Sequence, residues 1–233
     1  MMKRLAGVGA AGIAAIAVGW AGYAALAWRR YGCVSSRRGP DELLDRFMPL
    51  YEVGEEHETR VRAGAVLTYE VLAGLDFDRS ALVSAIFRGR EILLRAHARR
   101  RPPRPFLEEI RGLGWRVLAE IPGRQLVFGA VTRPWEADVQ FRGVPPDAYA
   151  RFDEPGYVKI VWTVAVEPLP GGESVFRTAT RVATTDRDSR RRFRRYWAVF
   201  SPGILLIRSE MLRLVRTEAE RRAGAGWPAA LPA

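Results

Sequence analysis

The stretch that decides the fold is YVKIVWTVAVEPLPGGESVFRTATRVAT, residues 157–184. Apolar and polar positions alternate through most of it, a period of two that predicts β-strands at Tyr157–Glu167 and Ser174–Thr184. The segment between them, Pro168-Leu-Pro-Gly-Gly172, consists mostly of turn-forming residues. We therefore expect the two strands to form an antiparallel hairpin.

Elements outside this hairpin follow from the same kind of periodicity. A second hairpin is predicted where Trp115–Ile121 and Gln125–Val131 flank Pro122-Gly123-Arg124. A first strand is expected at Glu58–Ala63, and Pro134–Gly156 is expected to be irregular with a short strand at Val139–Phe141. Helices are predicted at Asp41–Met48, Ala65–Leu75, Ser80–Ala98 and Phe106–Leu113.

The last element is predicted to be a long amphipathic helix. Asp186, Asp188 and Ser189 offer side-chain oxygens that cap a helix N-terminus. From Phe193 to Val215, apolar residues recur at spacings of three and four, so one apolar stripe runs along the helix. Pro202-Gly203 lies inside this stripe and predicts a kink.

Alternation also assigns the faces of the strands. Alternate residues from Val158 to Val166 form the face expected to point inward, and Lys159, Val161 and Thr163 lie on the other. Rings, branched carbons and hydroxyls on an inner wall suit an amphipathic ligand, although the same side chains could complete a solid core. The residues predicted to line a cavity are Phe128, Val158, Ile160, Trp162, Val164, Phe176, Thr178, Thr180, Trp197, Phe200 and Ile204.

The order of these elements and several motifs resemble the START-like, or SRPBCC, superfamily over Glu58–Arg222. The likeness to uncharacterised bacterial members rests on Leu113-Gly-Trp115, Phe152-Asp-Glu-Pro-Gly-Tyr157, Val161-Trp-Thr-Val-Ala-Val-Glu-Pro168, and Thr180-Arg-Val182 leading to Arg192-Phe-Arg-Arg-Tyr-Trp197. The resemblance implies an α+β helix-grip fold, in which a curved antiparallel sheet wraps around the long C-terminal helix and leaves a cavity. Members include lipid-transfer domains, hormone-binding proteins and polyketide cyclases, so it also implies a hydrophobic ligand.

The N-terminal segment predicts a membrane anchor. Leu5–Trp28 carries no charged residue and is flanked by Lys3-Arg4 and Arg29-Arg30. As a helix it would reach roughly 36 Å, enough to span a hydrocarbon core of about 30 Å. The larger number of basic residues after it favours a single-pass protein whose globular part faces the cytoplasm. The alternative is a signal peptide cleaved after Ala25-Leu-Ala27, with export of the remainder.

These elements predict four regions along the chain. They are the anchor (residues 1–31), a linker with a possible short helix (32–57), the START-like domain (58–222) and a disordered tail (223–233). The single cysteine, Cys33, cannot form an internal disulfide, which agrees with a reducing compartment.

The formal net charge is +11, and all but two of the 37 basic residues are arginine. Beside a membrane anchor, clustered arginines are expected to contact anionic lipid headgroups. A solvated arginine surface without a partner is the alternative, and no nucleic-acid partner is expected because no DNA- or RNA-binding motif accompanies the charge. The arginines predicted to contact the membrane surface are Arg99, Arg100, Arg101, Arg190, Arg191, Arg194 and Arg195.

No catalytic motif is present in the sequence. His57 and His97, which lie before the first predicted strand and beside an arginine cluster, are expected at the surface. No metal site and no cofactor are expected, because clustered metal ligands and a glycine-rich phosphate loop are both missing. The sequence favours a membrane-anchored module that binds a hydrophobic or amphipathic small molecule or a lipid. A cyclase-like enzyme that positions a hydrophobic substrate, and an interaction protein with a filled cavity, are the alternatives.

Overall fold

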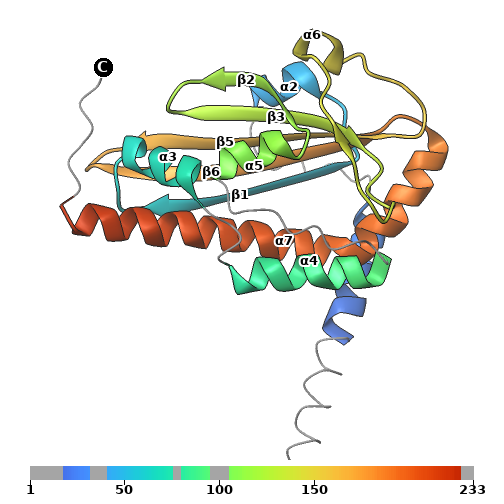
Figure 1. Cartoon of the computed structure of the whole chain (residues 1–233), viewed down its shortest axis with the longest axis horizontal. Helices are drawn as coiled ribbons and strands as arrows, with labels where there is room; N and C mark the ends of the chain where they lie inside the picture. Colours follow the sequence, from blue (N-terminus) through green and yellow to red (C-terminus); the bar gives the residue numbers. More distant parts are fainter. Residues whose placement is uncertain (1–17, 32–40, 76–79, 95–104, 227–233) are drawn as a thin grey trace, which may run out of the picture.

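A computed structural model describes residues 18–31, 41–75, 80–94 and 105–226 of the chain (Figure 1). Residues 18–30 form a helix. The remaining elements, in chain order, are α2 (Glu42–Phe47), β1 (Val53–Val61), α3 (Ala65–Gly74), α4 (Ala81–Leu94), α5 (Phe106–Gly112), β2 (Arg116–Ile121), β3 (Gln125–Thr132), β4 (Phe141–Arg142), α6 (Pro146–Tyr149), β5 (Val158–Leu169), β6 (Glu173–Thr184) and α7 (Arg187–Gly224).

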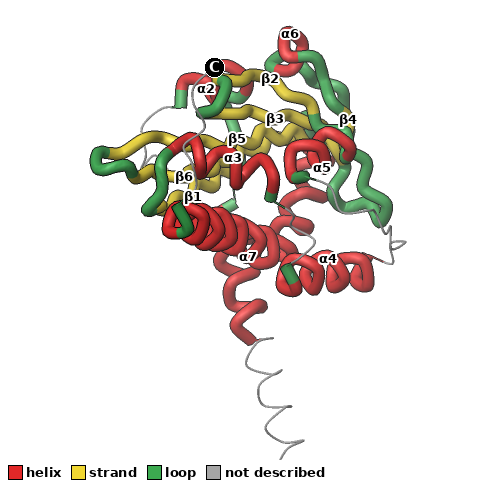
Figure 2. Tube along the Cα trace, turned by 60° about the vertical axis from the view of Figure 1, so that its left-hand side comes forward, coloured by secondary structure: helices red, strands yellow, loops and turns green. Residues whose placement is uncertain are grey.

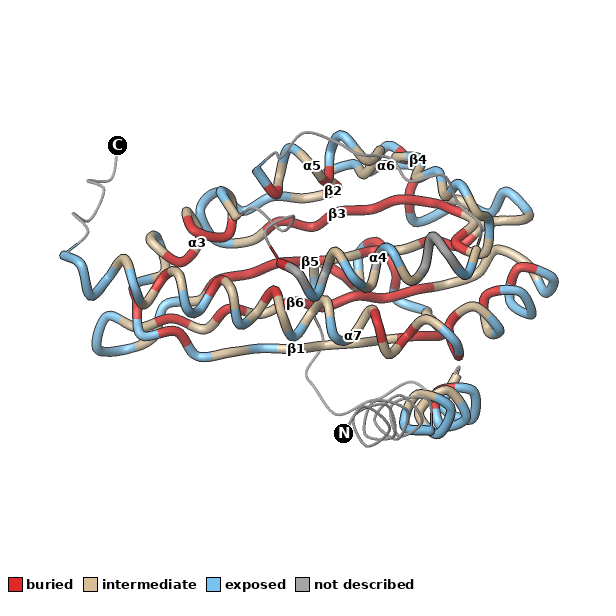
Figure 3. The backbone as a smooth tube through the Cα atoms, turned by 60° about the horizontal axis from the view of Figure 1, so that its bottom comes forward, coloured by how far each residue is buried: buried red, intermediate tan, exposed pale blue. Residues whose placement is uncertain are grey.

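The strands form one antiparallel sheet in the order β1-β6-β5-β3-β2, and β4 pairs with the end of β3. Figure 3 shows that β3 is buried along nearly its whole length, with only Gln125 partly exposed, whereas the edge strand β1 is mostly half-buried or exposed. The long helix α7 lies along one face of this curved sheet (Figures 1 and 3). The molecule is therefore an α+β protein with a curved antiparallel sheet and a long C-terminal helix, which is consistent with the helix-grip fold.

Helix α7 begins and bends where the sequence predicts. Asp186 is its N-cap, and the carboxylate accepts hydrogen bonds from the backbone N–H groups of Asp188 and Ser189, each at 2.8 Å. Pro202 lies inside the helix, where a proline ring removes one hydrogen bond and clashes with the preceding turn. Figure 1 shows that α7 changes direction on the way along the sheet, so the predicted kink is confirmed.

The predicted hairpins are confirmed, with small differences in their boundaries. The first strand starts at Val53, five residues before the predicted Glu58, so residues assigned to the linker belong to the sheet. The short strand predicted at Val139–Phe141 is found at Phe141–Arg142, and α6 forms within the segment expected to be irregular. The end of the helix predicted to reach Ala98 lies outside the described residues.

Both faces of the sheet carry packed side chains. The inner face, toward α7, carries the alternate residues from Val158 to Val166, as predicted. The second face is covered over one part by α2 and α6 (Figure 2), which the sequence did not predict. There Leu44, Phe47 and Tyr149 pack against Val127, Val131, Val161 and Ala179.

The helix at residues 18–30 packs against the first part of α7. Trp20 donates from Nε1 to the Val199 carbonyl oxygen at 2.8 Å, and the Tyr31 and Phe193 rings lie 5.9 Å apart. Arg194 lies over the Trp28 ring at 4.1 Å. Most of the predicted anchor, residues 5–17, lies outside the described residues, as do residues 227–233 of the tail. Within the described part of the chain, no helix combines the length and the apolar composition that crossing a membrane requires.

Candidate functional site

The inner face of α7 changes character along its length. Near the start of the helix, Phe193 and Trp197 pack with Val53, Val158 and Val182. Toward its end, Met211, Val215 and Ala219 pack with strand residues that include Val164, Val166 and Phe176. Between these two apolar clusters, Ser201, Ile204 and Arg208 follow one another at helical spacing on the same stripe. We call the part of the interior next to these three residues the middle section.

The strand register shows which inner-face residues of the sheet meet this stretch of α7. Thr180 of β6 pairs with Glu55 of β1 on one side and with Trp162 of β5 on the other. Thr178, two residues earlier, likewise lies between His57 and Val164. Residues two apart along a strand point to the same face. The ionisable side chains of Glu55 and His57 therefore belong to the inner face of the sheet, together with Thr178 and Thr180.

Side chains that border the middle section are less deeply buried than those on either side of it. Val158 and Val164 on the inner face of β5 are fully buried, but Ile160 and Trp162 between them are only half-buried. Because β5 is hydrogen-bonded to β6 and β3, its edges are covered, and this partial exposure lies on the inner face. Ile204 on the helix is half-buried as well. These side chains are therefore less completely buried than the residues of the flanking clusters.

Arg208 brings a charge into this section. Its Nη2 donates to Thr180 Oγ1 at 2.5 Å, and the guanidinium carbon lies 6.0 Å from the centre of the Trp162 ring. The residue as a whole keeps some exposure, but Nε and Nη1 are buried and have no hydrogen-bond partner among the described residues. Burial lowers the pKa of Arg208 to about 10, and the charge of Glu55 opposes this change. Arg208 thus stays a cation at neutral pH.

The polar groups near Arg208 differ in whether they have hydrogen-bond partners. Burial raises the pKa of Glu55, while the charges of Arg208 and Arg30 act in the opposite direction. The Thr178 hydroxyl is engaged within the fold, because it accepts from Trp162 Nε1 at 2.7 Å and donates to the Thr163 carbonyl oxygen at 3.0 Å. The Ser201 hydroxyl is buried and lacks a hydrogen-bond partner among the described residues. The middle section therefore combines apolar side chains with a few polar groups that can form additional hydrogen bonds.

The structure brings together only some of the residues predicted to line a cavity. Ile160, Trp162, Thr180 and Ile204 border the middle section. Phe200 is half-buried, and its ring lies 4.8 Å from that of Tyr196. The other six belong to the buried parts of the interior: Phe128, Val158, Val164, Phe176, Thr178 and Trp197.

Four residues of the middle section were missed by the sequence analysis. They are Glu55, His57, Ser201 and Arg208. The placement of His57 before the first strand, at the surface, was wrong, since it lies within β1 and its side chain is only 27% exposed. Its Nε2 lies 3.9 Å from Glu55 Oε2. The available signal was spacing, because Arg208 lies four residues after Ile204 and three before Met211.

The arginines predicted to contact a membrane surface divide into two groups. Arg190 pairs with Glu52 at 2.8 Å, and Arg194 donates to the Trp28 carbonyl oxygen at 3.0 Å, so both are engaged within the fold. Arg191 pairs with Asp188 at 3.6 Å but remains 78% exposed, and Arg195 is exposed too. Arg99, Arg100 and Arg101 lie outside the described residues.

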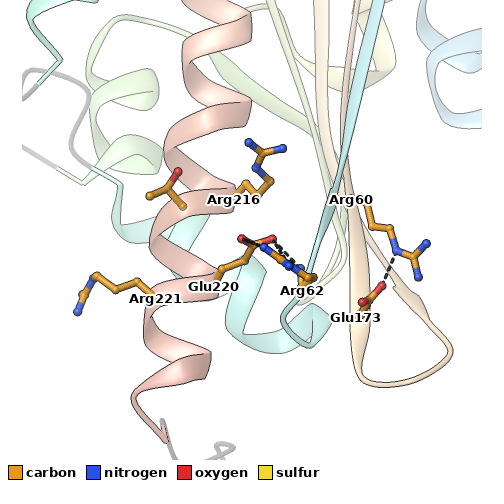
Figure 4. A pocket seen from close by; sticks show the side chains of 7 residues that line it. Arg60, Arg62, Glu173, Arg216, Glu220 and Arg221 are labelled. Carbon is orange, nitrogen blue, oxygen red and sulfur yellow. Dashed lines mark hydrogen bonds and ion pairs between the residues drawn. The ribbon is translucent and has the colours of Figure 1, made fainter.

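A hollow lies on the surface near the end of α7 (Figure 4). It is an open groove of about 700 Å³ lined by arginine and glutamate side chains with Thr217. Arg60 pairs with Glu173, and Arg62 pairs with Glu220 at 3.4 Å. Because these ion pairs offset much of the positive charge, the groove is a weaker candidate for an anion site than the middle section. Among the described residues, no group of histidine, cysteine, aspartate and glutamate side chains could hold a metal ion.

No protein-family model matches the chain, and no curated protein matches it either. Among solved structures, it is similar to the hypothetical protein jhp0584 from Helicobacter pylori, with 11% identity, a TM-score of 0.36, and coverage of 80% of this chain and 97% of the other. It is also similar to the Zhui aromatase/cyclase from Streptomyces sp. R1128, with 14% identity, a TM-score of 0.26, and coverage of 73% and 95%. For Ara h 8.0201 the values are 10%, 0.26, and 72% and 97%. The function proposed below is inferred from the chain's own residues.

Proposed function

We propose that the protein is a membrane-anchored, START-like module that binds a hydrophobic or amphipathic small molecule or a lipid between the sheet and α7. The observation that carries this proposal is the partial burial of Ile160 and Trp162 on the inner face, between two tightly packed apolar clusters. Small-molecule sites are commonly apolar walls with a few placed polar groups. The middle section has this composition.

The position of the N-terminal helix supports the membrane part of the proposal. Residues 18–30 pack against the first part of α7 through Trp20, Trp28 and Tyr31. If the segment that precedes residue 18 inserts into a bilayer, these contacts hold that part of the domain close to the lipid. A lipid or a membrane-dissolved molecule would then have a short path to the middle section.

The test is to purify the full chain from membranes, extract it with organic solvent, and analyse the extract by mass spectrometry. A matched variant, Ile204→Trp, fills the middle section from the helix side and leaves the apolar clusters unchanged. The expected result is a stoichiometric amphiphile with the wild-type chain and much less with the variant. Equal recovery from both, or no bound amphiphile, would contradict the proposal and favour an interaction protein with a filled interior.

A specific observation also supports a second candidate, a cyclase-like enzyme. Glu55, whose pKa is raised by burial, lies on the inner wall within electrostatic reach of Arg208, and His57 Nε2 lies 3.9 Å from the Glu55 carboxylate. A carboxyl group with a raised pKa is suited to general acid–base catalysis. Incubating the purified chain with its extracted ligand would then yield a product of altered mass, and Glu55→Gln would abolish this conversion while binding persists.

A further inference from the structure

Arg208 lies at a position where a positive charge destabilises the folded protein. It occupies the inner stripe of α7 between Ile204 and Met211, and its Nε and Nη1 are buried without a hydrogen-bond partner among the described residues. A buried charge destabilises a protein unless it is paired and hydrogen-bonded. Thr180 supplies only one neutral acceptor. The remaining donors point to an anionic partner.

Glu55 does not fill this role within the chain. Its charge acts on Arg208 through space, but none of the ion pairs in the described part of the chain joins the two residues. The hydrogen bond from Nη2 to Thr180 holds the guanidinium beside the Trp162 ring. The planar fork is thus fixed in position with two buried donors that have no acceptor among the described residues.

We propose that Arg208 binds the oxyanion of an amphipathic ligand, and that the ligand is a long-chain carboxylic acid. This inference rests on the proposed function and names the ligand class of the same site. A guanidinium matches a carboxylate through two parallel N–H···O bonds, and here Nη2 can pair with either Nε or Nη1 for this purpose. The hydrocarbon chain then lies over the half-buried apolar side chains Ile160, Trp162 and Ile204.

Glu55 gives the site a preference for a single negative charge. A phosphate monoester carries more negative charge than a carboxylate at neutral pH. The carboxylate of Glu55 offsets part of the positive charge of Arg208 and repels a second negative charge on the ligand. The site therefore favours the acid over an alkyl phosphate with the same chain.

The experiment compares ligands of one chain length on the delipidated full-length protein in detergent micelles. Binding of palmitic acid, palmityl alcohol and palmityl phosphate is measured by calorimetric titration with the wild type, Arg208→Gln and the surface control Arg124→Gln, which lies exposed in the turn between β2 and β3. The wild type and the control should bind the acid about tenfold to a hundredfold more tightly than the alcohol, as expected for a charge-assisted hydrogen bond. In Arg208→Gln this preference should be lost, while the affinity for the alcohol is unchanged. Circular dichroism verifies that each variant is folded.

Each other outcome has a defined meaning. Equal affinity of the wild type for acid and alcohol, or an acid preference that persists in Arg208→Gln, would overturn the role of Arg208 while leaving the proposed function intact. Tighter binding of the alkyl phosphate would assign the oxyanion to a phosphate and overturn the preference for a carboxylate. Failure of all three ligands to bind would contradict the proposed function itself.

Discussion

Helix α7 packs against the sheet in two different ways. Its later turns bury Met211, Val215 and Ala219 against fully buried strand residues such as Phe176. Its middle turns place Ser201, Ile204 and Arg208 opposite half-buried residues, and Ser201 Oγ and Arg208 Nε and Nη1 are buried without a hydrogen-bond partner in the described structure. The same helix and the same sheet face thus form a dry core in one place and an incompletely packed section in another.

The later turns and the middle turns of α7 differ in how they contribute to the stability of the fold. Burying apolar surface is the dominant favourable term in folding, and the later turns of α7 have the composition that maximises it. A buried, unpaired arginine opposes folding. Its presence between two well-packed clusters supports the proposal that the middle section binds a ligand.

The largest expected effect is in the dry core. Phe176→Ala removes a fully buried ring and should lower the free energy of unfolding by about 3–5 kcal/mol. Ile204→Ala removes a half-buried side chain from the middle section and should cost less than about 2 kcal/mol, below the range for fully buried residues. Denaturant unfolding of the ligand-free protein measures both. Equal losses would mean that the two regions are packed alike.

Arg208→Met is expected to stabilise the ligand-free protein. It removes a buried charge whose Nε and Nη1 lack partners among the described residues and keeps a side chain that fits the apolar surroundings, so we expect a gain of about 1–2 kcal/mol. Arg195→Met at the exposed surface should change stability very little. Destabilisation by Arg208→Met would show that the arginine has a structural role.

The start of α7 provides a smaller effect with a defined pH dependence. Hydrogen bonds from the backbone N–H groups of Ser189 and Gly156 lower the pKa of Asp186 in the folded protein. Its contribution is therefore complete above the unfolded-state pKa of about 3.9 and is lost as the pH falls through the folded-state pKa. Asp186→Ala should cost about 1 kcal/mol at pH 7, and unfolding curves should show a smaller difference from wild type near pH 2.

The smallest effect concerns the exposed arginines in the first turns of α7. In a chain that begins at residue 18, Arg191→Gln combined with Arg195→Gln should weaken sedimentation with anionic vesicles by about 1 kcal/mol for each side chain. Added salt should reduce wild-type binding in the same way. Arg213→Gln at an exposed site elsewhere on α7 is the control. Unchanged sedimentation of the double variant would reject headgroup contact by this surface.

The fold was predictable from sequence because periodicity and turn residues agree with one another. The period of two in residues 157–184 and the spacing of apolar residues in α7 identify the hairpin, the inner face and the helix that covers it. The start of β1 was missed because Gly54, Glu55 and Glu56 have low strand propensity, and pairing with β6 overrides it. This error also placed His57 outside the sheet.

The polar part of the site was harder to predict. In a chain with so many arginines, Arg208 resembles an exposed residue, and only its position between Ile204 and Met211 marks it as inward-facing. The packing of α2 and α6 on the second face depends on contacts distant in sequence, such as Phe47 with Tyr149. Local patterns do not contain this information.

Photo-crosslinking tests the central claim most directly. A palmitic acid analogue with a diazirine in its chain is bound to the full-length protein, irradiated, and the labelled peptides are mapped by mass spectrometry. The account predicts labelling of the inner face of β5 around Ile160 and Trp162 and of α7 around Ile204, which excess palmitic acid suppresses. Labelling confined to the second face of the sheet or to the surface groove near Arg216 would contradict it.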